Sequence, residues 1–376
     1  MQLTSPTISK VTALALLLSQ TLYAENYASL EFLYYDESSD RVSVIAPMLT
    51  LNYDIGTDYT IKASILHDSV SGATPAWQPD STSGASSRDN SGDYRYANQA
   101  FDEQRNAASL MLTTRFASRD ELSVGVDYSR ESDFDGITLS TEYLHYTDSS
   151  HNRSLSLGVS YGVNEILSYD YDTGSGASHK EESTALTLQA GITQVLTTQS
   201  SLKVDGFAII DDGYLTNPHA NVVRHYGTAQ QALLTEHRPS SRTAYGTTLS
   251  YITMLGEQTS LKGRYRFYRD DWEITSHTLE ADLYYQLTPA ITLGAGVRGY
   301  TQSEAEFYHA SKSYFTDETY ASSDERLSDF DAMTYKASID YRQSETISYN
   351  LGGSFYTQPN NDLEAITVTT GIKYHF

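Results

Sequence analysis

Apolar and polar residues alternate one by one along most of this chain, and a repeat of two residues is the period of a β-strand. The alternation is regular in residues 154–161, 291–298 and 366–376. In each of these segments, one face would carry mainly apolar or aromatic side chains and the other mainly small, polar or charged ones. Strands of about ten residues with two such faces are typical of membrane-spanning β-barrels.

Counting these segments gives about sixteen strands, with fourteen or eighteen as alternatives. We expect them near residues 27–36, 41–53, 58–68, 104–116, 121–131, 137–147, 153–164, 183–195, 201–211, 242–255, 259–269, 274–287, 290–303, 329–343, 346–357 and 364–376.

The connections between these segments are sorted by length. Every second connection is short, as at 54–57, 197–200 and 344–345, while the others include the long segments 69–103, 165–182, 212–241 and 304–328. Outer-membrane barrels have short periplasmic turns and longer extracellular loops. The sequence therefore predicts an all-β, closed, antiparallel transmembrane β-barrel, with both chain ends on the side of the short turns.

Residues 1–24 have the composition of a secretory signal peptide. A single cation, Lys10, precedes an apolar run that is too short to span a bilayer, and the segment ends in Ala24. No later stretch has 18 consecutive apolar residues. We therefore expect cleavage after Ala24, one barrel domain over 25–376, and a final location in the outer membrane of a Gram-negative bacterium.

The last eight residues resemble the signal that the barrel-assembly machinery reads in outer-membrane proteins. Gly371, Tyr374 and the terminal Phe376 occupy the positions of its glycine and aromatic residues. We expect these three residues to be the assembly signal.

Net charge and cysteine content exclude several classes of function. The formal charge is −23 and no basic run is present, which argues against a nucleic-acid partner. The absence of cysteine excludes thiol catalysis and thiolate metal sites. The 31 tyrosines suit a membrane boundary, because a tyrosine combines an apolar ring with a polar tip.

Several segments resemble a family of outer-membrane barrels whose name records only that its function is unknown. They are 68–75 (DSVSGATP), 83–86 (SGAS), 102–105 (DEQR), 191–196 (GITQVL), 265–272 (YRFYRDDW), 300–303 (YTQS) and 324–328 (DERLS). The resemblance covers essentially the whole mature chain. Members of this family are often encoded beside a small lipoprotein, thioredoxin-like proteins and flavin-transferring enzymes. The resemblance thus implies a redox or lipoprotein partner in the envelope.

Motifs for cofactors and metals do not support a site. Residues 294–299 match the dinucleotide fingerprint by letter, but they lie in an alternating strand and not at a turn into a helix. Acidic turns at 133–136 and 211–213 lack the twelfth-position ligand of a calcium loop, although loose divalent binding near lipopolysaccharide stays open. We expect no cofactor, no metal and no catalytic residue.

A hydrolase on the outside of a barrel would need a serine, a histidine and an acid or amide group on one patch. His67, His145 and His277 could each supply the base, but the sequence alone indicates no partner for any of them.

Charged residues are expected on the inner face of the barrel. The alternation places Lys262, Arg264 and Arg266 inward on one strand, Glu280 and Asp282 inward on the next, and Arg298 inward on the strand after that. Antiparallel pairing should set Arg264 opposite Glu280 and Lys262 opposite Asp282 as ion pairs. This ladder makes the lumen mixed in charge and slightly basic, as either a structural lattice or an ion-tuned wall.

The segment 69–103 is too long for an ordinary turn. We expect it to fold against or into the mouth of the barrel as a constriction, with Asp68, Arg88 and Arg105 near its base.

These features favour a non-enzymatic outer-membrane channel or transport barrel for an unknown solute. A structural or docking barrel for an envelope electron-transfer or flavin-linked system is the alternative, and an outer-membrane hydrolase is a weaker one. Besides the assembly machinery, the expected partners are outer-membrane lipid and lipopolysaccharide.

Overall fold

A computed structural model of the protein describes residues 26–79, 94–169, 178–309 and 315–376. Within them, sixteen antiparallel strands close into one barrel, which confirms the fold and the strand number expected from the alternation. The barrel strands are β1 (Tyr27–Glu37), β2 (Val42–Ile55), β3 (Tyr59–Pro79), β4 (Tyr94–Arg115), β5 (Glu121–Arg130), β6 (Phe134–Tyr146), β7 (Arg153–Tyr169), β8 (Ser178–Thr197), β9 (Ser200–Gly213), β12 (Ser241–Met254), β13 (Thr259–Asp270), β14 (Thr275–Thr288), β15 (Ile291–Gln302), β16 (Phe330–Arg342), β17 (Ile347–Gln358) and β18 (Leu363–His375).

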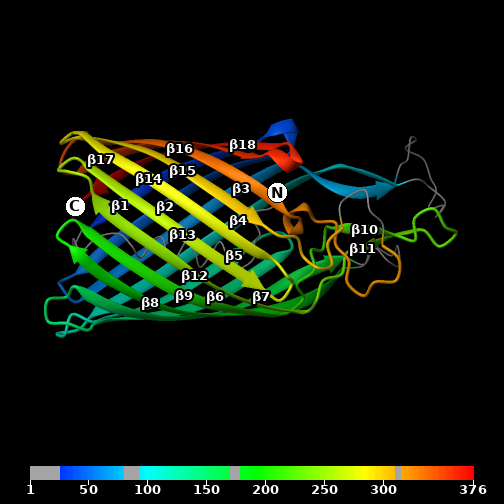
Figure 1. Ribbon diagram of the computed structural model, residues 1–376, viewed down its shortest axis with the longest axis horizontal. Coiled ribbons are helices and arrows are strands. Elements are labelled where there is room, and N and C mark those ends of the chain that lie inside the picture. Colours follow the sequence, from blue (N-terminus) through cyan, green and yellow to red (C-terminus); the bar gives the residue numbers. More distant parts are fainter. Residues whose placement is uncertain (1–25, 80–93, 170–177, 310–314) are drawn as a thin grey trace.

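The barrel is closed by the first and last strands. β1 pairs with β18 in an unbroken register from Tyr27 opposite His375 to Glu37 opposite Ala365. Every other barrel strand pairs with its neighbours in chain order, with β9 next to β12. The C-terminus therefore lies at the end of the barrel that carries the short turns, which we call the short-turn end (Figure 1).

The two faces of the wall differ as the alternation predicts. On β14, Leu279 and Leu283 point outward and are 67% and 42% exposed, whereas Glu280 and Asp282 between them are partly or fully buried. Exposed leucine costs roughly 25 cal/mol per Å² in water but nothing in lipid. The outer face is therefore the lipid-facing surface of an outer-membrane barrel, and the inner face is polar.

Aromatic rings gather at the short-turn end. Phe376 stacks with Tyr53 and with Tyr374, with ring centroids 6.3 and 6.0 Å apart, and Tyr341 stacks with Tyr349 at 6.3 Å. Such rings are favoured at the boundary between lipid and water. Among the described residues, no helix is long and apolar enough to cross a membrane.

At the opposite end, which we call the loop end, two of the expected long loops are partly strand. β3 and β4 remain paired out to Pro79 opposite Tyr94, so that 69–79 and 94–103 continue the wall as a hairpin beyond the barrel rim (Figure 1). β7 and β8 likewise pair out to Tyr169 opposite Ser178. The expectation of loops over these residues was wrong, because cross-strand pairing continued past the end of the clear alternation.

The other two long connections, 214–240 and the described parts of 303–329 (303–309 and 315–329), form a small folded layer at the loop end, which we call the mouth cap. It contains a two-stranded sheet of β10 (Asn221–Arg224) and β11 (Ala232–Thr235). The two segments are joined by bridges between Arg224 and Phe315 and between His237 and Ala321. These bridges tie together two segments that lie about a hundred residues apart in the chain.

Buried ion pairs stabilise the mouth cap. Arg238 contacts Glu236 at 2.5 Å and Asp324 at 2.7 Å, and Arg326 also binds Asp324. Burial opposes ionisation of Asp324, but the Arg326 guanidinium holds the pKa of that carboxyl well below its usual range. Because these arginines and carboxylates are paired with each other, burying them together costs much less free energy than burying any one of the charges alone.

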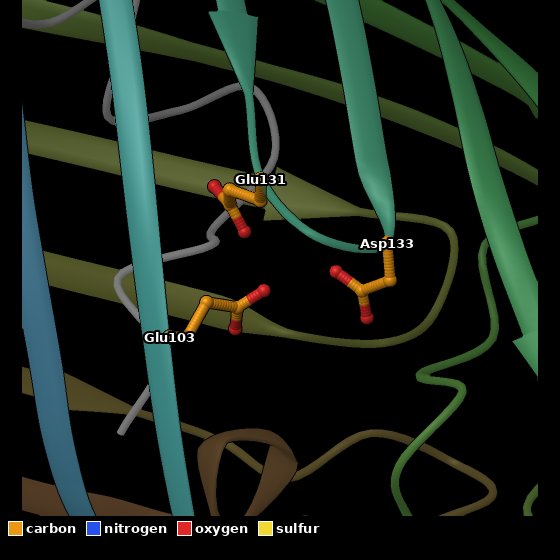
Figure 2. A group of neighbouring side chains, drawn as sticks. All are labelled: Glu103, Glu131 and Asp133. Atoms are coloured by element: carbon orange, nitrogen blue, oxygen red, sulfur yellow. The ribbon is translucent and has the colours of Figure 1, made fainter.

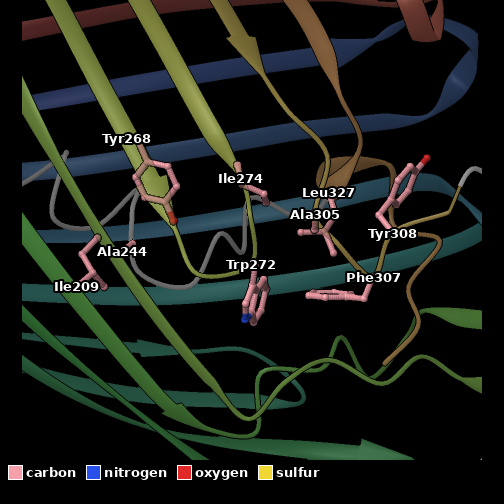
Figure 3. Packing of buried hydrophobic residues seen from close by; sticks show 9 residues of the cluster. All are labelled: Ile209, Ala244, Tyr268, Trp272, Ile274, Ala305, Phe307, Tyr308 and Leu327. Atoms are coloured by element: carbon pink, nitrogen blue, oxygen red, sulfur yellow. The ribbon is translucent and has the colours of Figure 1, made fainter. Parts of the chain in front are cut away.

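An apolar cluster joins the mouth cap to the barrel wall (Figure 3). Ile209, Ala244 and Tyr268 contribute from β9, β12 and β13, and Trp272 and Ile274 from the β13–β14 turn. Ala305, Phe307, Tyr308 and Leu327 complete it from the second cap segment. The cluster thus packs the second cap segment against the barrel wall at the loop end.

Candidate functional site

The inner charge ladder has the strand register that the sequence predicts. Arg264 lies opposite Glu280, Lys262 opposite Asp282, and Arg266 opposite Thr278. Arg298 lies on the other side of Glu280. These residues share the inner face, because Tyr265, Leu279 and Leu283 on the alternate positions face outward.

The ion pairs of the ladder differ in part from the expected ones. Arg264 and Glu280 are 3.9 Å apart between Nη1 and Oε2, as expected. Asp282, however, pairs with Lys336 at 2.5 Å, and Lys336 also contacts Glu280 at 2.8 Å. The predicted ion pair between Lys262 and Asp282 is therefore wrong.

Gly296 explains why Lys336 takes that place. It lies between Asp282 on β14 and Lys336 on β16 in the strand register. A Cβ atom at Gly296 would clash with the Asp282 carboxylate and would sit 2.8 Å from Cε of Lys336. The glycine thus leaves room for Lys336 to reach across a whole strand, and it has no part in a dinucleotide site.

Two of the remaining cations of the wall, Arg266 and Arg298, contact aromatic rings. The guanidinium of Arg266 lies 4.8 Å from the ring centroid of Phe207, and that of Arg298 lies 5.1 Å from the centroid of Tyr300. Neither cation, nor Lys262, has a carboxylate within ion-pair distance among the described residues. Five cations thus lie around Glu280 and Asp282 on the inner wall of β13 to β16, and Asp340 on β16 adds a third inward carboxylate nearer the short-turn end.

The Lys336 bridge should be more important for stability than the Arg264 contact. We expect Lys336→Met to lower the free energy of unfolding by about 1–3 kcal/mol, because it leaves Asp282 without its cation and Glu280 with only the longer Arg264 contact. Arg264→Gln should lower the free energy of unfolding by less, because the Arg264–Glu280 ion pair is longer than the two that Lys336 forms. Reversible urea unfolding of the two variants in detergent measures the difference, and equal losses would contradict this assignment.

The predicted constriction residues are only partly described. Arg105 binds Asp68 across β3 and β4, with Nη2 and Oδ2 at 2.6 Å. Arg88 lies outside the described residues. The two described residues form an ion pair on the strands, and their role in a constriction stays a prediction.

Three carboxylates converge beside this pair at the loop end. Glu103 comes from β4, and Glu131 and Asp133 come from the turn between β5 and β6, with one oxygen of each within 4.8 Å of the others (Figure 2). Oxygen ligands of this kind could hold a divalent cation.

The pKa values of Glu131 and Asp133 in this group shift in opposite directions. Burial, and then the neighbouring Glu103 carboxylate, raise the pKa of Glu131 to about 7. Burial also acts on Asp133, but a 2.5 Å hydrogen bond with His219 lowers the pKa of Asp133. At pH 7 the Glu131 carboxyl is thus about half protonated, whereas the Asp133 carboxyl is ionised.

The structure gives each of the three histidines on the outer face a partner. Nδ1 of His67 is 2.9 Å from Oδ1 of Asn106, and Nδ1 of His145 is 3.1 Å from a carboxylate oxygen of Asp120. His277 is 2.8 Å from the hydroxyl of Tyr265. None of these partners was apparent in the sequence, because each lies on another strand or turn.

The assembly-signal residues lie in the strand that closes the barrel. Gly371 faces inward between Asn350 and Glu31, where a Cβ atom would clash with the Asn350 amide. Tyr374 and Phe376 point outward and are 50% and 54% exposed. Recognition by the assembly machinery stays a prediction.

Sequence reasoning missed Lys336 and the anchor of the mouth cap. Arg242 binds Asp270, and its guanidinium lies 4.7 Å from the ring centroid of Trp272. The indole Nε1 of Trp272 donates to the carbonyl oxygen of Ser241 at 3.0 Å. The signal that could have found this site is Trp272 in the acidic turn 270–273, because a large apolar side chain is not expected in a turn that is surrounded only by water.

Comparisons with known proteins agree on little beyond the type of fold. A model of a family described as "Protein of unknown function (DUF3570)" matches residues 4–373. No curated protein matches the chain.

Among solved structures, a mutant of the ferric enterobactin receptor of Pseudomonas aeruginosa has a TM-score of 0.47 at 10% identity. The match covers 90% of this chain and 55% of the receptor. The toluene transporter TodX of Pseudomonas putida has a TM-score of 0.44 at 11% identity, with 94% and 89% covered. A loop L8 deletion mutant of OmpT, an outer-membrane protein of Vibrio cholerae, has a TM-score of 0.43 at 10% identity. This match covers 94% of this chain and 98% of OmpT. The chain spans about half the length of the siderophore receptors it matches.

Proposed function

This chain belongs to the DUF3570 family of proteins of unknown function, and from the architecture of its barrel we propose that it is an outer-membrane channel that favours small anionic solutes. The observation that carries the proposal is the inner wall of β13 to β16. There, Lys262, Arg264, Arg266, Arg298 and Lys336 lie around Glu280 and Asp282, and Asp340 is a further inward carboxylate nearer the short-turn end.

The width of the barrel supports an aqueous lumen. Barrels with sixteen to eighteen strands are wide enough to leave a water-filled channel, whereas eight-stranded ones are filled by side chains. The ladder residues also keep contact with solvent, since the side chains of Lys336 and Arg264 are 32% and 19% exposed. Hydrated charges on the wall of a narrow lumen set which ions enter it.

The arrangement of the ladder favours anions for a specific reason. Lys336 contacts both Glu280 and Asp282, and Arg264 contacts Glu280, so that these two cations together balance the two carboxylates. Lys262, Arg266 and Arg298 are left to act on passing solutes. Two of these three are held against aromatic rings, which fixes their position without cancelling their charge.

Removing these three charges tests the proposal. The triple variant Lys262→Gln, Arg266→Gln and Arg298→Gln should move the reversal potential, measured across a bilayer in a tenfold KCl gradient, toward the potassium potential. A control variant loses the same charge at exposed positions away from the ladder, by Arg119→Gln, Lys180→Gln and Arg269→Gln.

The control should keep the reversal potential of the parent within a few millivolts. If the ladder variant does so as well, these cations do not select the solute and the proposal is wrong.

A further inference from the structure

His67 on β3 and Asn106 on β4 form a hydrogen-bonded pair on the lipid-facing side of the barrel. They lie directly opposite each other, and Nδ1 of His67 is 2.9 Å from Oδ1 of Asn106. An amide oxygen can only accept, so Nδ1 of the ring must carry the proton and donate it. The neutral ring therefore has its free lone pair on Nε2, which is the tautomer required of a general base.

Ser69 supplies a hydroxyl on the same face. It follows His67 by two residues on β3, so both side chains point outward, and it is partly exposed. Their Cα atoms are thus separated by ~6.7 Å along the strand. Side-chain rotations can bring the hydroxyl to Nε2 over that separation, and catalytic hydrogen bonds often tighten only when substrate binds.

A cation lies on the other side of the pair. Arg130 on β5 is opposite Asn106, and its side chain is 67% exposed. It forms an ion pair with the Asp135 carboxylate at 3.8 Å. An exposed guanidinium at this point can exchange that contact for a phosphate or a developing oxyanion.

The position of the pair matches the boundary between lipid and water. One row nearer the short-turn end, the outward side chains are Leu49, Ile65, Ala108, Tyr128 and Ile137, of which Ile65 is 62% exposed. Between the row of His67 and the loop end, the outward side chains of β3 and β4 are polar; they are Ser69, Ser71, Gln104 and Asp102. The ester groups of membrane lipids lie at this change from apolar to polar surroundings.

We propose that this patch is a serine hydrolase site for the acyl esters of membrane lipids. Ser69 is the nucleophile, His67 is the general base and acid, and Asn106 is a positioning residue that fixes the tautomer and orientation of the imidazole. The required groups are a serine, a histidine and an amide, and two neighbouring strands place all three on one outward patch.

The chemistry balances with water as the only co-reactant. Oγ of Ser69 attacks the ester carbonyl carbon while Nε2 of His67 takes the hydroxyl proton. The carbon–oxygen bond to the lipid alcohol then breaks, and His67 returns the proton to the leaving alkoxide. Water, deprotonated by His67, cleaves the acyl-serine and releases a fatty acid and free Ser69.

A fluorophosphonate probe with an alkyl chain tests the site on the folded, full-length mature barrel in detergent. We expect the probe to modify Ser69, as identified by mass spectrometry of the labelled peptide. His67→Gln should slow labelling by about 100-fold or more, the usual contribution of a general base. Ser71→Ala, which removes the next outward hydroxyl on β3, should label like the parent.

Asn106→Ala distinguishes positioning from mere structural support. If Asn106 holds the tautomer, this variant should slow labelling and shift its pH profile, while the heat-modifiable fraction of folded barrel stays unchanged. Absence of label on Ser69, or an undiminished rate in folded His67→Gln, overturns the proposal.

Two lipid sources carry such esters, and separate assays distinguish them. Release of fatty acid from vesicles of phosphatidylethanolamine and phosphatidylglycerol assigns a glycerophospholipid substrate. Release only from purified lipopolysaccharide assigns its ester-linked acyl chains. Release from neither by the parent overturns the proposal. Because Ser69 faces lipid, Ser69→Ala should not change the reversal potential, so this test is independent of channel function.

Discussion

Deletion of Phe376, or Phe376→Asp, is expected to remove nearly all folded protein from the outer membrane while export continues. Phe376 directly follows β18, the strand that closes the barrel, and its N–H donates to the carbonyl oxygen of Asn26 at 3.0 Å. Its ring is 54% exposed on the lipid face and stacks with Tyr53. The change therefore removes both a closing contact and an aromatic anchor at the boundary, and a new carboxylate there would be poorly solvated.

The heat-modifiable band in isolated outer membranes measures this effect. Phe376→Tyr is the matched control, because it keeps an aromatic ring at the same position and should keep most of the folded protein. Normal amounts of folded barrel in the deletion variant would show that the terminal ring is not part of an assembly signal.

Trp272→Ala is expected to unfold the mouth cap while leaving the barrel intact. Trp272 is 5% exposed, and its ring packs edge-on against Phe307 with centroids 5.1 Å apart. Removing a buried tryptophan costs about 3–5 kcal/mol, which is much of the free energy available to so small a layer. The Arg242 guanidinium would also lose the ring that covers it.

Limited proteolysis and conductance report this change separately. Cleavage within 303–328 should become at least tenfold faster, and channel conductance should rise as the mouth opens. Tyr226→Ala, at an exposed tyrosine of the same cap, is the control and should leave both quantities unchanged. Unaltered proteolysis of the Trp272 variant would mean that the apolar cluster does not hold the cap.

The barrel itself could be predicted because each strand repeats the same local rule. A segment such as 274–287 alternates apolar and polar residues, and shifting it by one residue would turn Glu280 and Asp282 toward lipid. The bilayer thus constrains the register, which is why Arg264 opposite Glu280 could be found from the hairpin alone. Strand ends were less predictable, since β3 and β4 stay paired beyond the membrane, where lipid no longer imposes alternation.

Contacts between distant segments could not be read from the sequence. Lys336 displaces Lys262 at Asp282 only because Gly296 leaves space between them. The mouth cap depends on the meeting of 214–240 with 303–329, and nothing local in either segment indicates the other. The pair of His67 and Asn106 likewise needs the register of β3 against β4.

Single-channel recording of the purified, refolded protein in a planar lipid bilayer tests the central claim most directly. We predict discrete current steps and, in a tenfold KCl gradient, a reversal potential on the chloride side of zero. The reason is that three inner-wall cations have no carboxylate partner within the part of the chain that the structure describes. A silent bilayer that contains protein shown to be folded by heat modifiability would contradict the account. It would favour a barrel that serves as a structural or docking partner.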